Sequence, residues 1–149
     1  MPTMIAQTIQ LALAPVFVLV AIGSIMNILS SRLGRVVDRA RQLEARYQET
    51  EGEEHDAIVR EIRMADRRLV LLNRAILILV ASAMCIGTTV VLLFLEEFAH
   101  AGLQPVAAGV FILAITLLMA ALLLFLMETR EAAAALRIPR SYLETDRKL

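Results

Sequence analysis

The chain alternates between long apolar stretches and one long charged stretch. No charged side chain occurs in residues 1–31, 75–95 or 106–127, whereas residues 32–68 are rich in arginine and glutamate. At about 1.5 Å rise per residue, some 20 apolar residues in a helix cross a hydrocarbon layer of about 30 Å. The pattern therefore predicts three transmembrane helices, over residues 5–30, 69–96 and 106–127.

The charged stretch has its own apolar periodicity. Apolar residues recur there at alternating intervals of four and three, which is the heptad pattern of packed helices. In the first half they are Leu29, Leu33, Val36, Ala40, Leu43 and Tyr47, and in the second half Ile58, Ile62, Ala65, Leu69, Leu72, Ile76 and Leu79. The turn-like stretch between the halves is ETEGEEHD, with Gly52 at its centre. We therefore predict a helical hairpin over residues 31–68, in which the first transmembrane helix continues outward, turns, and returns as the second.

The predicted fold class follows from these two patterns. The chain is expected to be an all-α membrane protein with three transmembrane helices, the first two extended into a long antiparallel cytoplasmic coiled-coil hairpin. Residues 1–149 form a single membrane domain in this interpretation, and residues 128–149 form a cytoplasmic tail.

Charges along the hairpin provide a test of its register. With a turn at about residue 51, oppositely charged side chains meet across the two halves. The expected partners are Asp38 with Arg63 or Arg67, Arg35 with Asp66, Arg41 with Glu61, and Glu44 with Arg60. Exposed pairs of this kind contribute only ~0.2 to 1 kcal/mol each, so they select the register more than they stabilise the fold.

The distribution of basic residues predicts the orientation in the membrane. Residues 31–74 carry ten arginines and residues 128–149 carry five basic residues, whereas the EEFAHAGLQP loop has none. Basic loops stay in the cytoplasm. We therefore expect the hairpin and the C-terminus in the cytoplasm, and the N-terminus and the loop around Gly102 outside.

The same arginines do not predict nucleic-acid binding. Residues 31–74 also contain nine acidic residues, which leaves a net charge of only +1. Residues 31–41 and 60–74 each total +3, while the tip at 42–59 totals −5. An anionic inner leaflet would attract the base of the hairpin and repel its tip. The expected partners are thus membrane lipids, a second copy of the chain, and a cytoplasmic protein at the acidic tip, for which a solvated turn is the simpler interpretation.

Several polar or helix-perturbing residues lie inside the predicted spans. Pro15 removes a backbone donor from the first span, which also holds Gly23, Ser24 and Asn27. The hairpin register brings Asn27 opposite Asn73 or Arg74 near the inner boundary. These residues suit either a packing face between helices or the lining of a pore. Arg74 can also extend its guanidinium to the membrane surface.

The sequence contains no pattern typical of an enzyme or a metal site. Glu96 and Glu97 are adjacent and point about 100° apart on a helix, so they do not form a catalytic pair. His55, His100 and the single cysteine, Cys85, lack companions at ligand spacing. We therefore predict no catalytic residue, no metal and no cofactor.

Part of the chain resembles a known family. The segment IQLALAPVFVLVAIGSIMNILSSRLGRVVDRARQLE, with the Ala-Pro-Val-Phe of residues 14–17, Asn27 and the run Val37, Asp38, Arg39, is similar to the opening of the domain-of-unknown-function family numbered 2721. The later segment RRLVLLNRAI also fits that family. The resemblance implies a small bacterial inner-membrane protein and implies no activity.

Two functions remain in competition. The first is a non-catalytic membrane protein that self-assembles through small-residue helix faces and presents its hairpin for assembly or partner binding. The alternative is a homo-oligomeric ion channel or transporter subunit with the first helix lining the pathway. The scarcity of ionisable residues within the spans favours the first.

Overall fold

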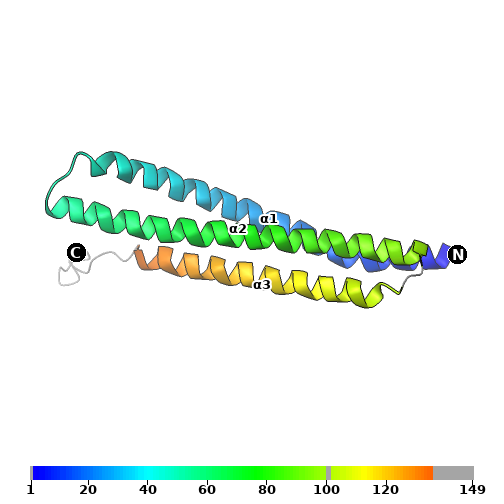
Figure 1. Cartoon of the computed structure of the whole chain (residues 1–149). Coiled ribbons are helices and arrows are strands. Elements are labelled where there is room, and N and C mark those ends of the chain that lie inside the picture. The colour runs from blue at the N-terminus through cyan, green and yellow to red at the C-terminus, as the bar shows by residue number, and fades with distance from the viewer. Residues whose placement is uncertain (1, 100–101, 136–149) are drawn as a thin grey trace, which may run out of the picture.

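The computed structural model describes residues 2–99 and 102–135. Within these ranges the chain forms three α-helices, in which α1 spans Pro2–Tyr47, α2 spans Glu53–Ala99 and α3 spans Gln104–Ala135 (Figure 1). All three are long and apolar enough to cross a membrane. The all-helical architecture and the three apolar helices that the sequence predicts are therefore confirmed.

The first two helices are much longer than a membrane span. With 46 and 47 residues, α1 and α2 each extend for about 70 Å, roughly twice the thickness of a hydrocarbon layer. Both continue without a break across the change from apolar to charged sequence, at Ser31 in α1 and Leu69 in α2. Residues 16–104 contain no proline, and leucine, arginine, glutamate and alanine are all good helix formers. Helix α1 also continues through Pro15.

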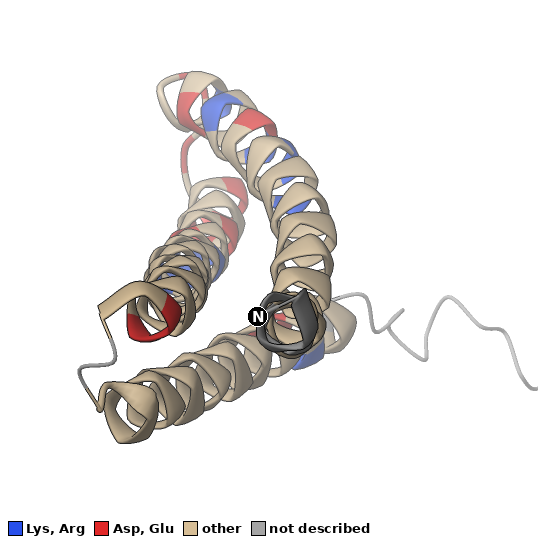
Figure 2. Ribbon diagram, turned by 90° about the vertical axis from the view of Figure 1, so that its right-hand side faces the viewer, with Lys and Arg blue, Asp and Glu red and all other residues tan. Residues whose placement is uncertain are grey.

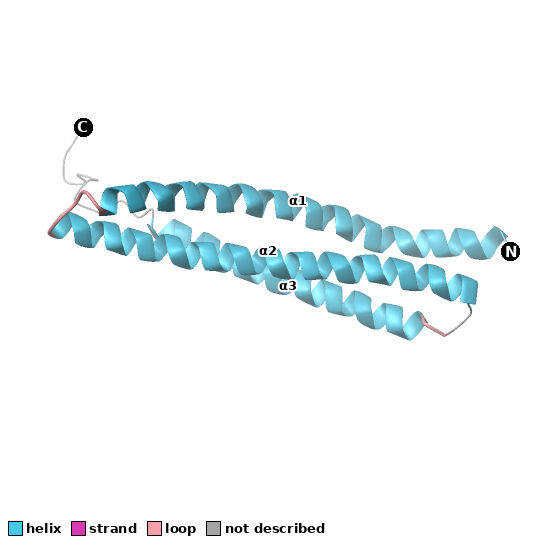
Figure 3. Ribbon diagram, turned by 45° about the horizontal axis from the view of Figure 1, so that its top comes forward, coloured by secondary structure: helices cyan, strands magenta, loops and turns pink. Residues whose placement is uncertain are grey.

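The turn between α1 and α2 is short and specific. Gly52 has a φ of 70°, a left-handed conformation that favours glycine. The rings of Tyr47 and His55 lie 4.5 Å apart across this turn, which is drawn in pink in Figure 3. Glu53 and Glu54 open α2, where negative charge is favourable next to the exposed backbone amides of a helix start. These features reverse the chain so that α2 returns alongside α1.

The connection to α3 is closed by a side chain. Gly102 again has a positive φ, of 69°, and the Leu103 amide donates a hydrogen bond to the Glu96 carboxylate near the end of α2. The Ala107 amide then donates to the Leu103 carbonyl at 2.9 Å. Pro105 lies in the first turn of α3, where its missing amide hydrogen costs no helical hydrogen bond. The positions of Gly102 and Pro105 thus explain where α3 begins.

Helix α2 is the centre of the molecule. It packs along α1 on one side and along α3 on the other, while α1 and α3 make few contacts with each other (Figures 1 and 3). The three helices therefore form two pairs that share α2, and much of the apolar surface of α1 and α3 faces outward.

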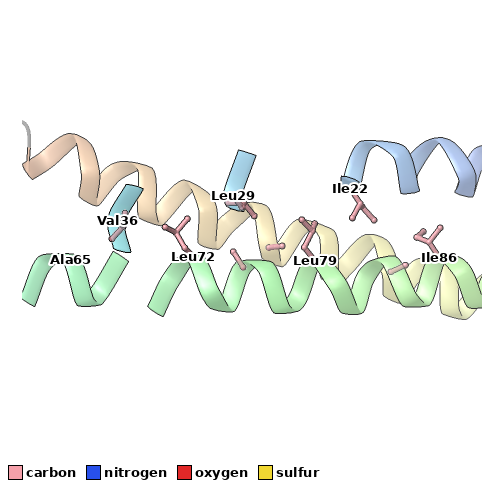
Figure 4. Packing of buried hydrophobic residues seen from close by; sticks show 10 residues of the cluster. Ile22, Leu29, Val36, Ala65, Leu72, Leu79 and Ile86 are labelled. Carbon is pink, nitrogen blue, oxygen red and sulfur yellow. The ribbon is translucent and has the colours of Figure 1, made fainter. Parts of the chain in front are cut away.

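The α1–α2 pair buries one residue in every seven on each helix. The buried residues at this spacing are Pro15, Ile22, Leu29, Val36 and Leu43 on α1, and Ile58, Ala65, Leu72, Leu79 and Ile86 on α2. Ala12 is also buried on α1. Figure 4 shows Val36 above Ala65, and Ile22 pointing toward the space between Leu79 and Ile86. Leu29, Leu72 and Leu79 are completely buried. The burial extends from the apolar half of the molecule into its charged half.

The α2–α3 pair is built from small residues. The buried positions are Ala75, Ser82 and Thr89 on α2 and Ala107, Ala114 and Ala121 on α3, again seven residues apart. We call these six residues the small-residue seam. The Ser82 hydroxyl donates a 2.7 Å hydrogen bond to the Ala114 carbonyl, which brings a side chain directly against the neighbouring backbone. Such close approach is typical of helices that pack in lipid.

The charged residues gather at the end of the molecule that contains the α1–α2 turn. In Figure 2 the blue and red segments lie mainly on the halves of α1 and α2 near that turn, and most of the α3 ribbon is tan. Helix α3 ends at Ala135 and accompanies only part of these charged halves. We call residues 33–67, which form the charged parts of α1 and α2 and the turn between them, the arm, and the end of α3 lies beside its base.

Candidate functional site

A carboxylate is fully buried at the junction between the arm and the apolar bundle. The side chain of Glu128 on α3 has no exposed surface, and both of its oxygens accept hydrogen bonds from arginines on the other helices. Arg32 on α1 donates through Nη1 to Oε2 at 3.0 Å. Arg68 on α2 donates through Nε and Nη2 to Oε1 at 3.0 and 2.8 Å. We call these three residues the clamp.

The heptad spacing explains how Glu128 reaches this place. It lies seven residues after Ala121 and continues the α3 side of the small-residue seam. Arg68 lies seven residues before Ala75 and continues the α2 side of the same seam. The two helices run in opposite directions, so the next position on one meets the next position on the other. The seam thus ends in a charged pair instead of a pair of small residues.

The clamp also lies at the boundary between apolar and polar sequence on every helix. Arg32 is the first charged residue of the chain, Arg68 precedes the apolar half of α2, and Glu128 directly follows a charge-free stretch that begins at residue 98. The three charges therefore occur at one level of the bundle. They are the points where each helix passes from sequence suited to lipid to sequence suited to water.

Neighbouring groups complete the coordination of Arg32. Its Nη1 also donates to the Thr129 hydroxyl at 3.3 Å, and its guanidinium carbon lies 5.0 Å from the centre of the Phe125 ring. This distance is within the range of a cation–π contact. Arg32 and Arg68 side chains are 30% and 28% exposed, so the guanidiniums reach water while the carboxylate does not. Two cations and one anion leave the clamp with an excess positive charge.

The ion pairs of the clamp join the three helices to one another. Both oxygens of the buried Glu128 carboxylate accept charge-assisted hydrogen bonds from guanidiniums. The carboxylate links α3 to α1, two helices that otherwise make few contacts. A buried carboxylate that loses its partners is strongly unfavourable. The arrangement consequently favours one relative position of the three helices.

The clamp was not predicted from the sequence. The alanine-rich start of the predicted tail, residues 128–149, was expected to extend the third helix beside the hairpin, and residues 128–135 do continue α3. Residues 136–149 lie outside the described part of the chain. A signal was present, because Ala107, Ala114, Ala121 and Glu128 are evenly spaced. A charge at the end of an otherwise apolar heptad stripe predicts a buried partner.

One of the predicted hairpin residues, Glu61, forms an ion pair across the arm in the structure. Across the arm, an ion pair joins Glu61 to Arg39, on an exposed surface, through hydrogen bonds from both Nε and Nη2. The sequence had assigned Arg41 to Glu61, two residues further along α1. Within the described residues no ion pair involves Arg35, Asp38, Arg41, Glu44, Arg60, Arg63 or Asp66.

The other candidate residues lie mostly on outer surfaces. Gly23, Ser24 and Asn27 are exposed on α1, and Asn73 and Arg74 are exposed on α2. The Ser24 hydroxyl donates to the Val20 carbonyl in its own helix at 3.2 Å. No hydrogen bond or ion pair joins Asn27 to Asn73 or Arg74 in the described part of the chain. A single copy of the chain therefore does not gather these residues around a common axis.

Pro15 is the exception, because it is buried and faces a pocket. The pocket has a volume of about 220 Å³ and lies at the end of the bundle away from the arm, between all three helices. Pro15 lines it together with Leu11, Thr89 and Phe111, among other residues. The Thr89 hydroxyl donates a hydrogen bond to the Cys85 carbonyl of its own helix at 2.9 Å. The lining is thus predominantly apolar.

The remaining titratable groups form no metal centre in the described ranges. No group of three or more His, Cys, Asp or Glu side chains is placed there to hold an ion. Glu96 accepts a hydrogen bond from the Leu103 amide. The His55 ring contacts the Tyr47 ring at a tilt of 45°, and its Nδ1 is buried without a hydrogen-bond partner among the described residues. Cys85 is partly buried within α2, and His100 lies outside the described residues.

Comparison with known proteins gives one result. The family model described as "Protein of unknown function (DUF2721)" matches residues 12–138. No curated protein and no solved structure matches the chain. The match extends from the apolar part of α1 through the arm to the end of α3, and it includes every member of the clamp. The chain therefore belongs to the DUF2721 family of proteins of unknown function.

Proposed function

We propose that this protein is a non-catalytic, multi-pass membrane protein of the bacterial inner membrane that self-assembles and presents its arm in the cytoplasm. The arm is an antiparallel coiled-coil hairpin in this proposal, and it serves for assembly or for binding a cytoplasmic protein at its acidic tip. The observation that carries the proposal is the outward-facing apolar surface of the three helices.

That surface is extensive. In the most apolar 18-residue windows of α1, α2 and α3, only 17, 22 and 11% of the residues are buried. Exposed side chains on the apolar halves of α1 and α2 include Phe17, Met84 and Phe98, which are 70, 70 and 84% exposed. A water-soluble protein rarely exposes so much contiguous apolar area, whereas lipid is a favourable solvent for it. This supports placement of the apolar halves of all three helices in a bilayer.

The positions of the arginines support the orientation. The clamp and the arm both lie on the side of the bundle that carries the α1–α2 turn (Figures 1 and 2). That side contains every arginine of the described residues, and basic segments are retained in the cytoplasm. The short connection around Gly102 then lies outside.

Self-assembly is supported by an exposed polar strip on α1. Gly23 and Asn27 lie one turn apart on the side of α1 that faces away from α2, and both are exposed. A Cβ added at Gly23 would meet no atom within 4 Å, so this glycine serves no close contact within the chain. An asparagine amide without a partner is costly in hydrocarbon, and interhelical hydrogen bonds between such amides contribute roughly 1 kcal/mol. A second copy would supply the missing partner.

The proposal is tested by the copy number of the purified protein. We expect the detergent-solubilised wild type to be an oligomer by mass measurement, and the double substitution Gly23→Leu and Asn27→Leu to shift it toward the monomer. Ala21→Leu is the matched control, because Ala21 is also exposed on α1 but lies on a different side of the helix. A wild-type monomer, or equal effects of the control and the double substitution, would contradict assembly through this strip.

The channel alternative uses the same residues and is separated by conduction. Around a symmetric axis, Gly23, Ser24 and Asn27 would line a polar path, with the arm arginines at its cytoplasmic mouth. Single-channel current in planar bilayers that changes with Asn27→Leu would establish this role. An assembled protein that carries no current is the expected outcome for the non-conducting function.

A further inference from the structure

The arm is hollowed between its two helices, α1 and α2, which Figure 1 shows joined by the turn at its end. A groove of about 940 Å³ lies between them. Its apolar floor includes Val36, Leu43 and Ala65, which are buried residues of the α1–α2 pair.

The walls of this groove carry a marked excess of positive charge. Four arginines line it, two from each helix, against a single acid, Glu61. They are Arg35, Arg39, Arg60 and Arg68. Two smaller hollows on the arm are different, because each has two arginines and its own acid, which is Asp66 in one and Glu131 in the other. The imbalance of four to one in the groove is therefore larger than in either of these hollows.

Two of the four guanidiniums are not used by the fold. Arg39 is paired with Glu61, and Arg68 is paired with Glu128 in the clamp. Arg35 on α1 and Arg60 on α2 have no ion-pair partner in the described ranges. Arg35 lines the groove from α1 and Arg60 lines it from α2, and both are exposed. Their guanidinium donors are therefore available to an anion that enters the groove.

We propose that the groove binds a phosphate-bearing ligand, with Arg35 and Arg60 as its principal contacts. Guanidinium presents a planar fork of N–H donors that matches two phosphate oxygens, and arginine is favoured wherever phosphate is recognised in this way. The groove is much larger than a single phosphate ion and has an apolar floor. It therefore suits a phosphate that is attached to a larger group.

The position of the groove favours an anionic phospholipid as the source of that phosphate. Arg68 belongs both to the groove and to the clamp, so the groove begins at the level where α1, α2 and α3 leave their apolar sequence. This step rests on the proposed membrane placement, in which that level coincides with the inner headgroups. Headgroup phosphates would then lie at the mouth of the groove. A soluble phosphate compound is the other source of the same chemistry.

The test compares two variants that remove equal charge. Arg35→Ala with Arg60→Ala removes one groove arginine from each helix. Arg46→Ala with Arg67→Ala is the matched control, because it also removes one arginine from each helix and neither residue lines the groove. Circular dichroism would establish that both full-length variants keep their helical content before binding is measured.

Binding is measured in two experiments. In the first, phosphatidylglycerol is titrated into phosphatidylcholine nanodiscs that hold the protein, and retained lipid is counted by native mass spectrometry. In the second, pyrophosphate is titrated onto the protein in neutral detergent by calorimetry. Loss of two charge-assisted contacts should weaken binding of the recognised probe by about tenfold or more in the groove variant, and by far less in the control.

Each outcome decides the proposal. Weaker binding of phosphatidylglycerol in the groove variant alone assigns a lipid phosphate. Weaker binding of pyrophosphate in the groove variant alone assigns a soluble one. Equal weakening in both variants would show diffuse attraction and would overturn the groove as a site, as would the absence of any phosphate binding. Native mass spectra report the copy number separately, and the experiment in detergent needs no bilayer. A failure of self-assembly or of membrane orientation is therefore distinguishable from a failure of the groove.

Discussion

Glu128 occupies a position that α3 otherwise gives to alanine. Ala107, Ala114 and Ala121 fill the earlier positions of the same stripe, each nearly or fully buried. A glutamate at the fourth position is tolerable because Arg32 and Arg68 place three guanidinium nitrogens within 3.0 Å of its two oxygens. At this point the packing energy of a small residue is replaced by charge-assisted hydrogen bonds. These hold three helices where an alanine could hold only two.

Removal of the Glu128 carboxylate should therefore destabilise the bundle strongly. We expect Glu128→Ala to cost about 3 kcal/mol, at the lower end of the range for breaking a buried ion pair, since the guanidiniums left behind can still reach water. Circular dichroism during titration with SDS would measure this loss. Glu131→Ala is the control, because Glu131 is exposed one turn further along α3, and its substitution should change stability by less than about 0.5 kcal/mol.

A second variant separates charge from shape at the clamp. Replacing Arg32, Arg68 and Glu128 together by methionine removes the ions and keeps much of their volume, and such replacements are often neutral or stabilising. The triple variant should recover most of the stability that Glu128→Ala loses. If the triple variant is as unstable as the single one, the charge-assisted hydrogen bonds of the clamp stabilise the bundle by more than packed methionines can replace.

At the scale of the helices, a residue pattern predicted the packing where only one helix face could match it, and did not where several could. The intervals of four and three in α1 predict a buried stripe. Leu29, Val36 and Leu43 are buried, whereas Leu33 and Ala40 are partly buried and Tyr47 is exposed. The continuation of α1 and α2 through the charged stretch also followed from the absence of proline in residues 31–68 and from the turn sequence at Gly52. Both features are local, so the sequence contains them directly.

The α2–α3 pairing could not be predicted in the same way. A stripe of alanines on α3 packs equally well against any helix with small residues, and α2 offers two different buried stripes. Which one α3 occupies is decided by distant contacts, above all Ser82 with the Ala114 carbonyl and Arg68 with Glu128. Charge pairing across the arm was similarly underdetermined, because long exposed side chains such as Arg39 and Arg41 reach several partners at little difference in energy.

The turn gives a prediction at this scale. Gly52 has a φ of 70°, so Gly52→Ala should destabilise the protein by about 1 kcal/mol through strain in a left-handed conformation. Gly34→Ala is the matched contrast, because Gly34 is an exposed residue in the middle of α1 and an added Cβ there meets no atom within 4 Å. It should stabilise α1 by about 0.5 to 1 kcal/mol. The same SDS titration compares the two, and effects of the same sign would contradict this account of the turn.

At the scale of the whole molecule, the two helix pairs share α2 and leave α1 and α3 with outward apolar surfaces. The molecule is therefore divided along its length and not into a core and a shell. One half is suited to hydrocarbon, the arm is suited to water, and the clamp lies between them. In such a molecule the side of the membrane on which the arm lies decides which partners it can meet, and orientation becomes the first property to establish.

Orientation is measured by the reaction of single cysteines with an impermeant thiol reagent added to intact cells. Gly52 and Gly102 are poor sites for a new cysteine because both have positive φ values, of 70° and 69°. The neighbouring Glu51 and Gln104 are exposed and lack this constraint, and Cys85→Ala supplies the background. We expect Gln104→Cys to react from outside and Glu51→Cys to react only after the membrane is permeabilised, since basic segments are retained in the cytoplasm. The reverse labelling would place the arm outside, where its arginines could not meet the inner leaflet. Reaction of both sites in intact cells would mean that α1 and α2 do not carry the chain across the bilayer together.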